Sequence, residues 1–204
     1  MIQSLRAEFN EGWSESAYRD LIGRLEVRTG AALAFPLSET PCFFPESLIS
    51  ELADTGLALV DQILGNPDVA SAARQAVPAR YAGTGADTLP TFLQVDFGLV
   101  RNAAGAIEPK LVELQAFASL YGFQLAMAEA YRDAFQLPAA LSPFIGDLDL
   151  PLYLSLAGDA ITAGQDPNEV VLMEIEPRQQ KTWPDFVITE QLWGVRAIDT
   201  SEVR

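Results

Sequence analysis

The sequence predicts an α+β fold in which helices pack on an antiparallel β-hairpin, followed by the opening of a parallel βαβ layer. Two observations carry this prediction. Apolar residues alternate along 91–101 and 107–115, with helical spacing before and after them. From about Pro151 the pattern is a short helix, a strand, a helix and a strand, an order typical of parallel sheets. We therefore expect one region over 1–150 and a second, incomplete domain over 151–204.

Helical spacing predicts four helices ahead of that last part. The first is followed by Gly30, and glycine commonly ends helices. The second begins at Pro45, because proline suits the first turn of a helix. Ser119 is placed to cap the N-terminus of the fourth. The expected ranges are 14–27, 45–65, 67–76 and 119–136, and 78–90 is expected to be a loop.

The expected hairpin places polar residues at alternate positions of both strands. Alternate residues share a face, so Gln94 and Asp96 point one way, and so do Glu113 and Gln115. If the turn is the four residues 102–105, Gln94 lies opposite Glu113 and all four side chains share one surface. A loop of odd length would separate them.

Two carboxylates and two amides on one surface are suited to a divalent cation bound through oxygen. Ser119 and Tyr121 open the next helix, where backbone N–H groups attract the carboxylate or phosphate of a ligand. The alternative interpretation is that this surface is only the solvated side of a hairpin, which is normally polar. The spacing alone favours that simpler interpretation.

Composition narrows the class of function. Lys and Arg number 13 against 28 Asp and Glu, so a formal charge of -15 disfavours nucleic acid and anionic membranes as partners. The chain has no histidine and one cysteine, Cys42, which removes histidine-based catalysis and cysteine-cluster metal sites. The N-terminus does not resemble a secretory signal, and we expect a cytoplasmic protein.

The last part of the chain has its own candidate site. We expect strands over 170–175 and 195–198 with a helix over 185–193 between them. Gln180 and Lys181 follow the first strand, at the edge where ligands bind in open α/β sheets. We therefore predict that they contact the substrate. The alternative is that they only lead into the next helix. Glu174 and Glu176 alternate on the same strand, but paired carboxylates are also common without catalysis.

Two segments resemble a known family. Phe92–Gln124, FLQVDFGLVRNAAGAIEPKLVELQAFASLYGFQ, is similar to the part of eukaryotic-type glutathione synthetases and glutathionylspermidine synthetases that reads R-x-D, a turn, I-E-x-N and then serine-rich residues. The segment 166–203 resembles the start of the Rossmann-like substrate domain of the same circularly permuted ATP-grasp ligases, which include bacterial members of unknown substrate.

The resemblance implies roles for single residues. Glu113 matches the magnesium-binding glutamate of the family, and Gln115 stands at the neighbouring asparagine ligand, so both are expected to contact Mg-ATP. Asp96 matches the aspartate of R-x-D, and Ser119 falls near the serines that hold the peptide substrate. Gln94 replaces the arginine that pairs with a substrate carboxylate, which changes the expected substrate.

The family's glycine-rich phosphate loop is not visible in this sequence. The resemblance therefore implies the N-terminal half of an ATP-dependent carboxylate–amine ligase, inactive alone and partnered by a C-terminal ATP-grasp half or by a second copy. Its expected ligand is small and amino-acid-like or a peptide. The alternative is a non-catalytic ligand-binding or protein-interaction module derived from such a ligase. An unrelated carboxylate-based hydrolase has only the acidic pairs in its favour.

Overall fold

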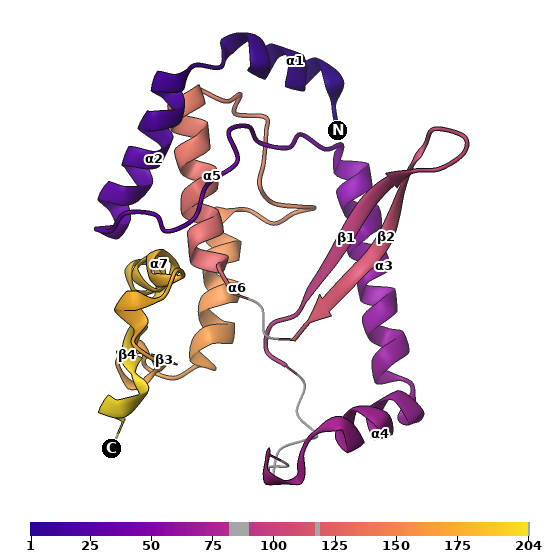
Figure 1. Ribbon diagram of the computed structural model, residues 1–204, viewed down its shortest axis with the longest axis vertical. Helices are drawn as coiled ribbons and strands as arrows, with labels where there is room; N and C mark the ends of the chain where they lie inside the picture. Colours follow the sequence, from indigo (N-terminus) through magenta and orange to yellow (C-terminus); the bar gives the residue numbers. More distant parts are fainter. Residues whose placement is uncertain (82–89, 117–118, 204) are drawn as a thin grey trace. The chain divides into compact units, whose positions relative to one another are not determined.

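The computed structural model describes residues 1–81, 90–116 and 119–203 (Figure 1). The chain forms two compact units, one made of Met1–Pro45 with Ser119–Arg204 and the other of Glu46–Ala118. The predicted α+β class is confirmed. The expected boundary at residue 150 falls inside the first unit, because helices on both sides of it pack against the same helix, α7.

The first unit is built on helices α1 (Gln3–Gly12), α2 (Glu15–Thr29), α5 (Tyr121–Phe135), α6 (Leu150–Thr162) and α7 (Trp183–Trp193). Helix α2 begins where Ser14 Oγ accepts the backbone N–H of Ala17 at 3.2 Å, and it ends at Gly30 with φ of 65°. Helix α1 was not predicted. Helix α6 begins at Asp149, whose side chain accepts the N–H of Leu152 at 2.9 Å.

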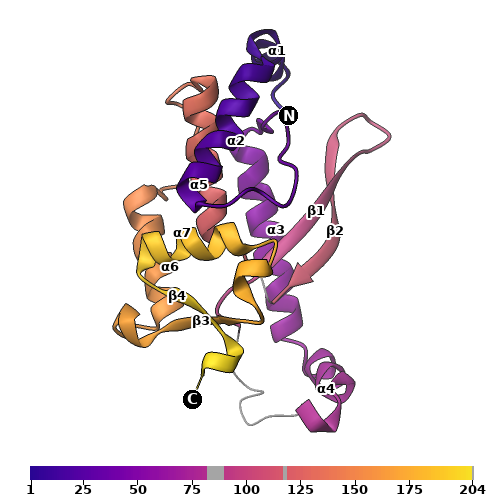
Figure 2. The ribbon, with the colours of Figure 1, turned by 60° about the vertical axis from the view of Figure 1, so that its left-hand side comes forward.

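The core of the first unit lies between α2, α5 and α7. Figures 1 and 2 show α2 running beside α5. Leu21 and Leu25 from α2 and Ile188 from α7 are the large side chains most completely removed from solvent. Phe123, Ala126 and Ala130 from α5 complete the same cluster. Burial of these side chains stabilises the unit through the hydrophobic effect.

The last part of the unit holds strands β3 (Val171–Glu174) and β4 (Arg196–Asp199). They pair in parallel, with Val171 opposite Arg196, and α7 connects them. Figure 2 shows α7 beside this pair. Short 3-10 helices occupy Pro167–Glu169 (η2), Pro177–Gln179 (η3) and Thr200–Glu202 (η4). The predicted succession of strand, helix and strand is therefore present, and α7 begins two residues earlier than expected.

The second unit contains α3 (Glu46–Leu64), α4 (Pro67–Ala76), the 3-10 turn Ala79–Tyr81 (η1), β1 (Gln94–Arg101) and β2 (Ile107–Gln115). The predicted helices and hairpin are present within a few residues. Gly56 of α3 lies against β1, since a Cβ there would stand 3.4 Å from Val95 Cγ2. The expected loop over 78–90 falls mostly on 82–89, outside the described residues.

Candidate functional site

The hairpin loop is one residue longer than the four-residue turn, 102–105, that would place Gln94 opposite Glu113. The backbone N–H of Gly105 donates to Asn102 O at 2.9 Å, so the four expected turn residues do form a turn. Gly105 has φ of 79°, a left-handed conformation that adds Ala106 to the loop, and Asn102 N–H donates to Ala106 O at 3.0 Å. Arg101 therefore lies opposite Ile107. The loop therefore spans residues 102–106, an odd length.

A β-bulge compensates for the longer loop. Asp96 lies opposite Glu113, whereas the next residue, Phe97, lies opposite Leu111, so Val112 has no partner across the ladder. The extra residue shifts the alternation of β2 back into phase with β1. The pair Gln94–Glu113, which a four-residue turn would give, does not form, because Gln94 lies opposite Gln115. The four polar side chains nevertheless share one surface, as their hydrogen bonds show.

These four residues, Gln94, Asp96, Glu113 and Gln115, form what we call the polar hairpin face. Gln94 Nε2 donates to Asp96 Oδ1 at 2.8 Å. Gln115 Nε2 donates to Asp96 Oδ2 at 3.2 Å and also to Glu113 Oε1. One amide group thus bridges two carboxylates and holds them together, while the other amide orients Asp96.

The two carboxylates of the polar hairpin face have no cationic partner in the described ranges. Lys110 on the same strand is paired with Glu108, and Arg101 donates to Gly105 O at 3.0 Å. Asp96 is half-buried and Glu113 is exposed. Adjacent carboxylates without a counter-charge attract a cation, either a metal ion or an ammonium group. No cluster of three or more His, Cys, Asp and Glu suited to a metal occurs among the described residues.

The expected anion site at the start of α5 already holds a carboxylate. The helix begins at Tyr121, and Leu120 precedes it in a left-handed conformation with φ of 72°. Asp185 of α7 accepts the backbone N–H of Leu120 at 3.2 Å and of Phe123 at 2.8 Å. The prediction that Ser119 caps this helix is therefore wrong, because Asp185 supplies the acceptor from far along the chain.

Asp185 is 5% exposed, and burial raises the pKa of its carboxyl. Backbone hydrogen bonds from Phe123, Leu120 and Gly122 lower the pKa and offset this only in part. Sequence reasoning missed this residue, which it treated as the start of a helix. The sequence signal available was a carboxylate in the first turn of α7.

Ser119 and Tyr121 belong to the first compact unit and the polar hairpin face to the second. Ser119 is exposed. Tyr121 is half-buried, and its backbone carbonyl accepts the hydroxyl of Tyr153 at 2.9 Å. Burial raises the pKa of the Tyr121 hydroxyl.

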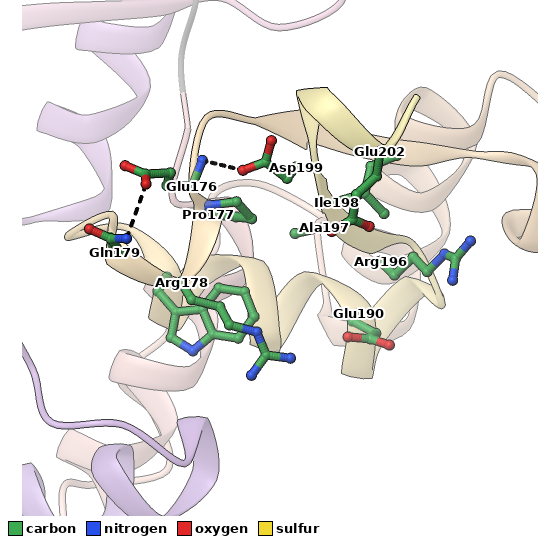
Figure 3. A pocket seen from close by; sticks show the side chains of 11 residues that line it. Glu176, Pro177, Arg178, Gln179, Glu190, Arg196, Ala197, Ile198, Asp199 and Glu202 are labelled. Carbon is green, nitrogen blue, oxygen red and sulfur yellow. Dashed lines mark hydrogen bonds between the residues drawn. The ribbon is translucent and has the colours of Figure 1, made fainter. Parts of the chain in front are cut away.

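A groove of about 470 Å³ lies beside β4, near the segment that holds Gln180 and Lys181 (Figure 3). Neither residue lines it. Gln180 Nε2 donates to Ile175 O at 2.7 Å, and Lys181 is exposed. The groove is lined by residues of η3, α7, β4 and η4: Glu176, Pro177, Arg178, Gln179, Trp183, Glu190, Arg196, Ala197, Ile198, Asp199 and Glu202.

Asp199 accepts several hydrogen bonds at one end of this groove. Its Oδ2 accepts the backbone N–H of Glu176 at 2.8 Å (Figure 3). Its Oδ1 accepts the N–H and hydroxyl of Ser201. These hydrogen bonds lower the pKa of the Asp199 carboxyl. Arg178 lies over the ring of Trp183 at 5.3 Å. Sequence reasoning missed Arg178, which lies two residues before Gln180, and it missed Arg196 and Asp199, which lie on the second strand and reach the groove only after folding.

Comparison with known proteins finds no family model, no curated protein and no solved structure that matches this chain. Within the described residues, no helix combines the length and the apolar character that crossing a bilayer requires.

Proposed function

We propose that this chain is the magnesium- and substrate-binding part of an ATP-grasp-like carboxylate–amine ligase, and that it does not complete the ligation alone. The observation that carries the proposal is the pairing of Asp96 with Glu113 across the bulged hairpin, with Gln115 bonded to both. These are residues to which the resemblance to glutathione synthetase-like ligases assigns magnesium and substrate contacts.

The donor set of the polar hairpin face fits a magnesium ion. Mg²⁺ is typically held by one or two carboxylates, with water and substrate phosphate filling the other positions. Asp96 and Glu113 supply the carboxylates, and a turn of the Gln115 amide group presents its oxygen in place of its N–H₂. In such ligases the bound ion offsets the charge of the phosphates.

The residues beside that ion shape the choice of substrate. Gln94 bonds Asp96 and keeps the carboxylate oriented, but it carries no charge for pairing with a substrate carboxylate. We therefore propose a small amino-acid-like or peptide ligand that is bound at this point through neutral hydrogen bonds. The parallel pair β3–β4 with α7 between its strands supports the further proposal that a Rossmann-like substrate domain begins here.

Two features of the described residues that could grip the phosphates of ATP are already occupied. Lys110 is engaged by Glu108, and the N-terminus of α5 is filled by the Asp185 carboxylate. The negative formal charge of -15 opposes nucleotide binding further. Tight binding and turnover therefore require a partner that brings cations, either an ATP-grasp half or a second copy of the chain.

The alternative is a non-catalytic module that binds a cationic ligand on the same face. The occupied N-terminus of α5 favours it, because this removes one phosphate site, and so does the pair of carboxylates without a cation. In that case an ammonium group would take the place of magnesium between Asp96 and Glu113.

Calorimetric titration with MgCl₂ and then with Mg-ATP tests the proposal on wild type, Glu113→Gln and the control Glu51→Gln. Both variants remove one negative charge from an exposed residue of the second unit, but only Glu113 belongs to the polar hairpin face. We expect Glu113→Gln to weaken Mg-ATP binding about tenfold or more and Glu51→Gln to leave it unchanged. Equal binding by all three proteins would contradict the proposal. Binding of the diamine putrescine, lost in Glu113→Gln, with no response to Mg-ATP, would support the module instead.

A further inference from the structure

An apolar cavity of about 640 Å³ lies within the first unit, away from the groove beside β4. Its walls are the segment 35–44, one side of α5 and the segment 137–143. Most of the lining is aromatic or aliphatic, and the side chains that dominate it are Phe35, Phe43, Phe123, Met127, Tyr131 and Leu137. A cavity of this size and character is typical of sites for small organic molecules, which run to roughly 300–1,000 Å³.

The walls of this cavity are fixed by specific contacts. Tyr131 donates its hydroxyl to Ser38 O, and Tyr18 donates to Leu37 O at 3.0 Å, so two phenols of the helices tie down the irregular segment. The rings of Phe35 and Phe123 meet edge to face with centroids 5.5 Å apart. A cavity bounded in this way is formed before a ligand arrives, which lowers the entropic cost of binding.

Arg132 is the single cationic side chain that lines the cavity, among the described residues. Its guanidinium donates to Pro138 O and Leu141 O, and no carboxylate of the described part of the chain forms an ion pair with it. The neighbouring acids on α5 are engaged elsewhere, Glu129 by Arg28 and Asp133 by Arg24.

We propose that this cavity binds a small aromatic carboxylate, with its ring system among the aromatic side chains and its carboxylate on Arg132. A guanidinium presents several donors in one plane and matches the two oxygens of a carboxylate. Aromatic rings meet the walls edge to face or offset, which favours a ring over a flexible chain. The site belongs to the first unit and does not depend on the polar hairpin face.

Cys42 provides a reporter for this site. It is the single cysteine of the chain, it is exposed, and it lines the same cavity. The test follows alkylation of Cys42 by neutral iodoacetamide, measured by mass spectrometry, in the presence of 2-naphthylacetate or its uncharged analogue 2-naphthylacetamide. We expect naphthylacetate to slow alkylation and naphthylacetamide to need about tenfold higher concentration for the same protection.

The matched variants are Arg132→Gln and Arg19→Gln, which change the charge equally. Arg19 is exposed on α2 and does not line the cavity. Arg132→Gln should raise the half-protecting concentration of naphthylacetate to that of the amide, and Arg19→Gln should leave both values unchanged. Circular dichroism verifies folding, because Arg132 also holds backbone carbonyls. Ala128→Phe, which fills the cavity from α5, should abolish protection by both compounds.

Equal protection by naphthylacetate and naphthylacetamide on wild type would overturn the proposal, as would no protection by either compound. This comparison needs no variant, so it decides the question even if Arg132→Gln does not fold. An equal loss in Arg19→Gln and Arg132→Gln would also overturn it, because the effect would then arise from net charge. None of these results depends on magnesium or ATP, so they are separate from the test of the hairpin.

Discussion

Asp185 and Phe123 lie 62 residues apart in the sequence, and the Asp185 carboxylate accepts the backbone N–H of Phe123 at 2.8 Å. The first turn of α5 is thereby capped by a side chain from α7. This contact links the two helices at the point where both also contribute to the core, through Phe123 and Ile188. A capping carboxylate at a buried helix end satisfies donors that water does not reach.

Removing this cap should destabilise the first unit. Asp185→Ala leaves the buried N–H groups of Leu120 and Phe123 without an acceptor, at an expected cost of about 2–3 kcal/mol in the free energy of unfolding. Asp185→Asn keeps one acceptor oxygen and should cost less. Urea denaturation followed by circular dichroism measures both variants. Asp133→Asn, on the exposed side of α5, serves as the control and should change little. A cost for Asp133→Asn equal to that for Asp185→Ala would contradict this account.

The buried carboxyl of Asp185 also predicts a dependence of stability on pH. Burial raises the pKa of the folded-state carboxyl above 3.8, with the backbone hydrogen bonds acting in the opposite direction. The contribution of this group to stability is therefore complete below pH 3.8 and is lost as pH rises through the folded-state pKa. The difference in unfolding free energy between wild type and Asp185→Asn should shrink with rising pH over that interval.

Denaturation of both proteins at a series of pH values measures this difference, and the carboxyl ¹³C shift of Asp185 gives its titration directly. The pKa of Asp199 is shifted in the opposite direction, because the hydrogen bonds to its carboxylate lower it. Its contribution is present above the ordinary value of 3.8 and is lost as pH falls through the lower folded-state value. A titration of Asp185 below 3.8 would contradict the assignment of burial as the dominant influence.

Sequence periodicity predicted the secondary structure well where a helix or strand has one apolar face. The helix 14–27, the hairpin and the strand, helix and strand near the C-terminus are all present. The same reasoning failed at the start of α5, where Ser119 looked like a cap. Local patterns do not contain information on a partner such as Asp185, which reaches the helix through tertiary packing.

The candidate site was likewise predicted only where local pattern determines it. Alternation predicted that Gln94 and Asp96 share a face and that Glu113 and Gln115 share a face, and it left open whether the two faces coincide; the hydrogen bonds place all four side chains together. The pairs that a four-residue turn would give do not form, and neither the extra loop residue nor the bulge at Val112 leaves a signal in hydrophobic spacing. The cavity around Arg132 was not predicted, since it is formed by segments that meet after folding.

Close packing of α5 on α7 predicts opposite effects for two glycine substitutions. A Cβ at Gly122 would stand 3.2 Å from Ile188 Cγ2 and 3.3 Å from the backbone nitrogen of Thr189. Gly122→Ala should therefore destabilise the protein by about 1–2 kcal/mol. A Cβ at Gly23 in α2 meets nothing within 4 Å, so Gly23→Ala should stabilise the protein by about 0.5–1 kcal/mol. Thermal and urea denaturation compare the two. Stabilisation by both would show that the two helices are less closely packed than described here.

The bulge at Val112 predicts which residues of the hairpin can be cross-linked. In a Cys42→Ser background, cysteines at 96 and 113 lie directly opposite each other and should form a disulfide on mild oxidation. Cysteines at 94 and 113 would be opposite only with a four-residue loop and no bulge, and this pair should stay reduced. Mass spectrometry of tryptic peptides identifies the bond. Deleting Val112 removes the bulge and leaves residue 113 directly after Leu111 and still opposite residue 96, so the 96–113 bond should also form in that variant. Preferential oxidation of the 94–113 pair in the parent protein would show that the polar hairpin face has the simpler register, with Gln94 and not Asp96 opposite Glu113.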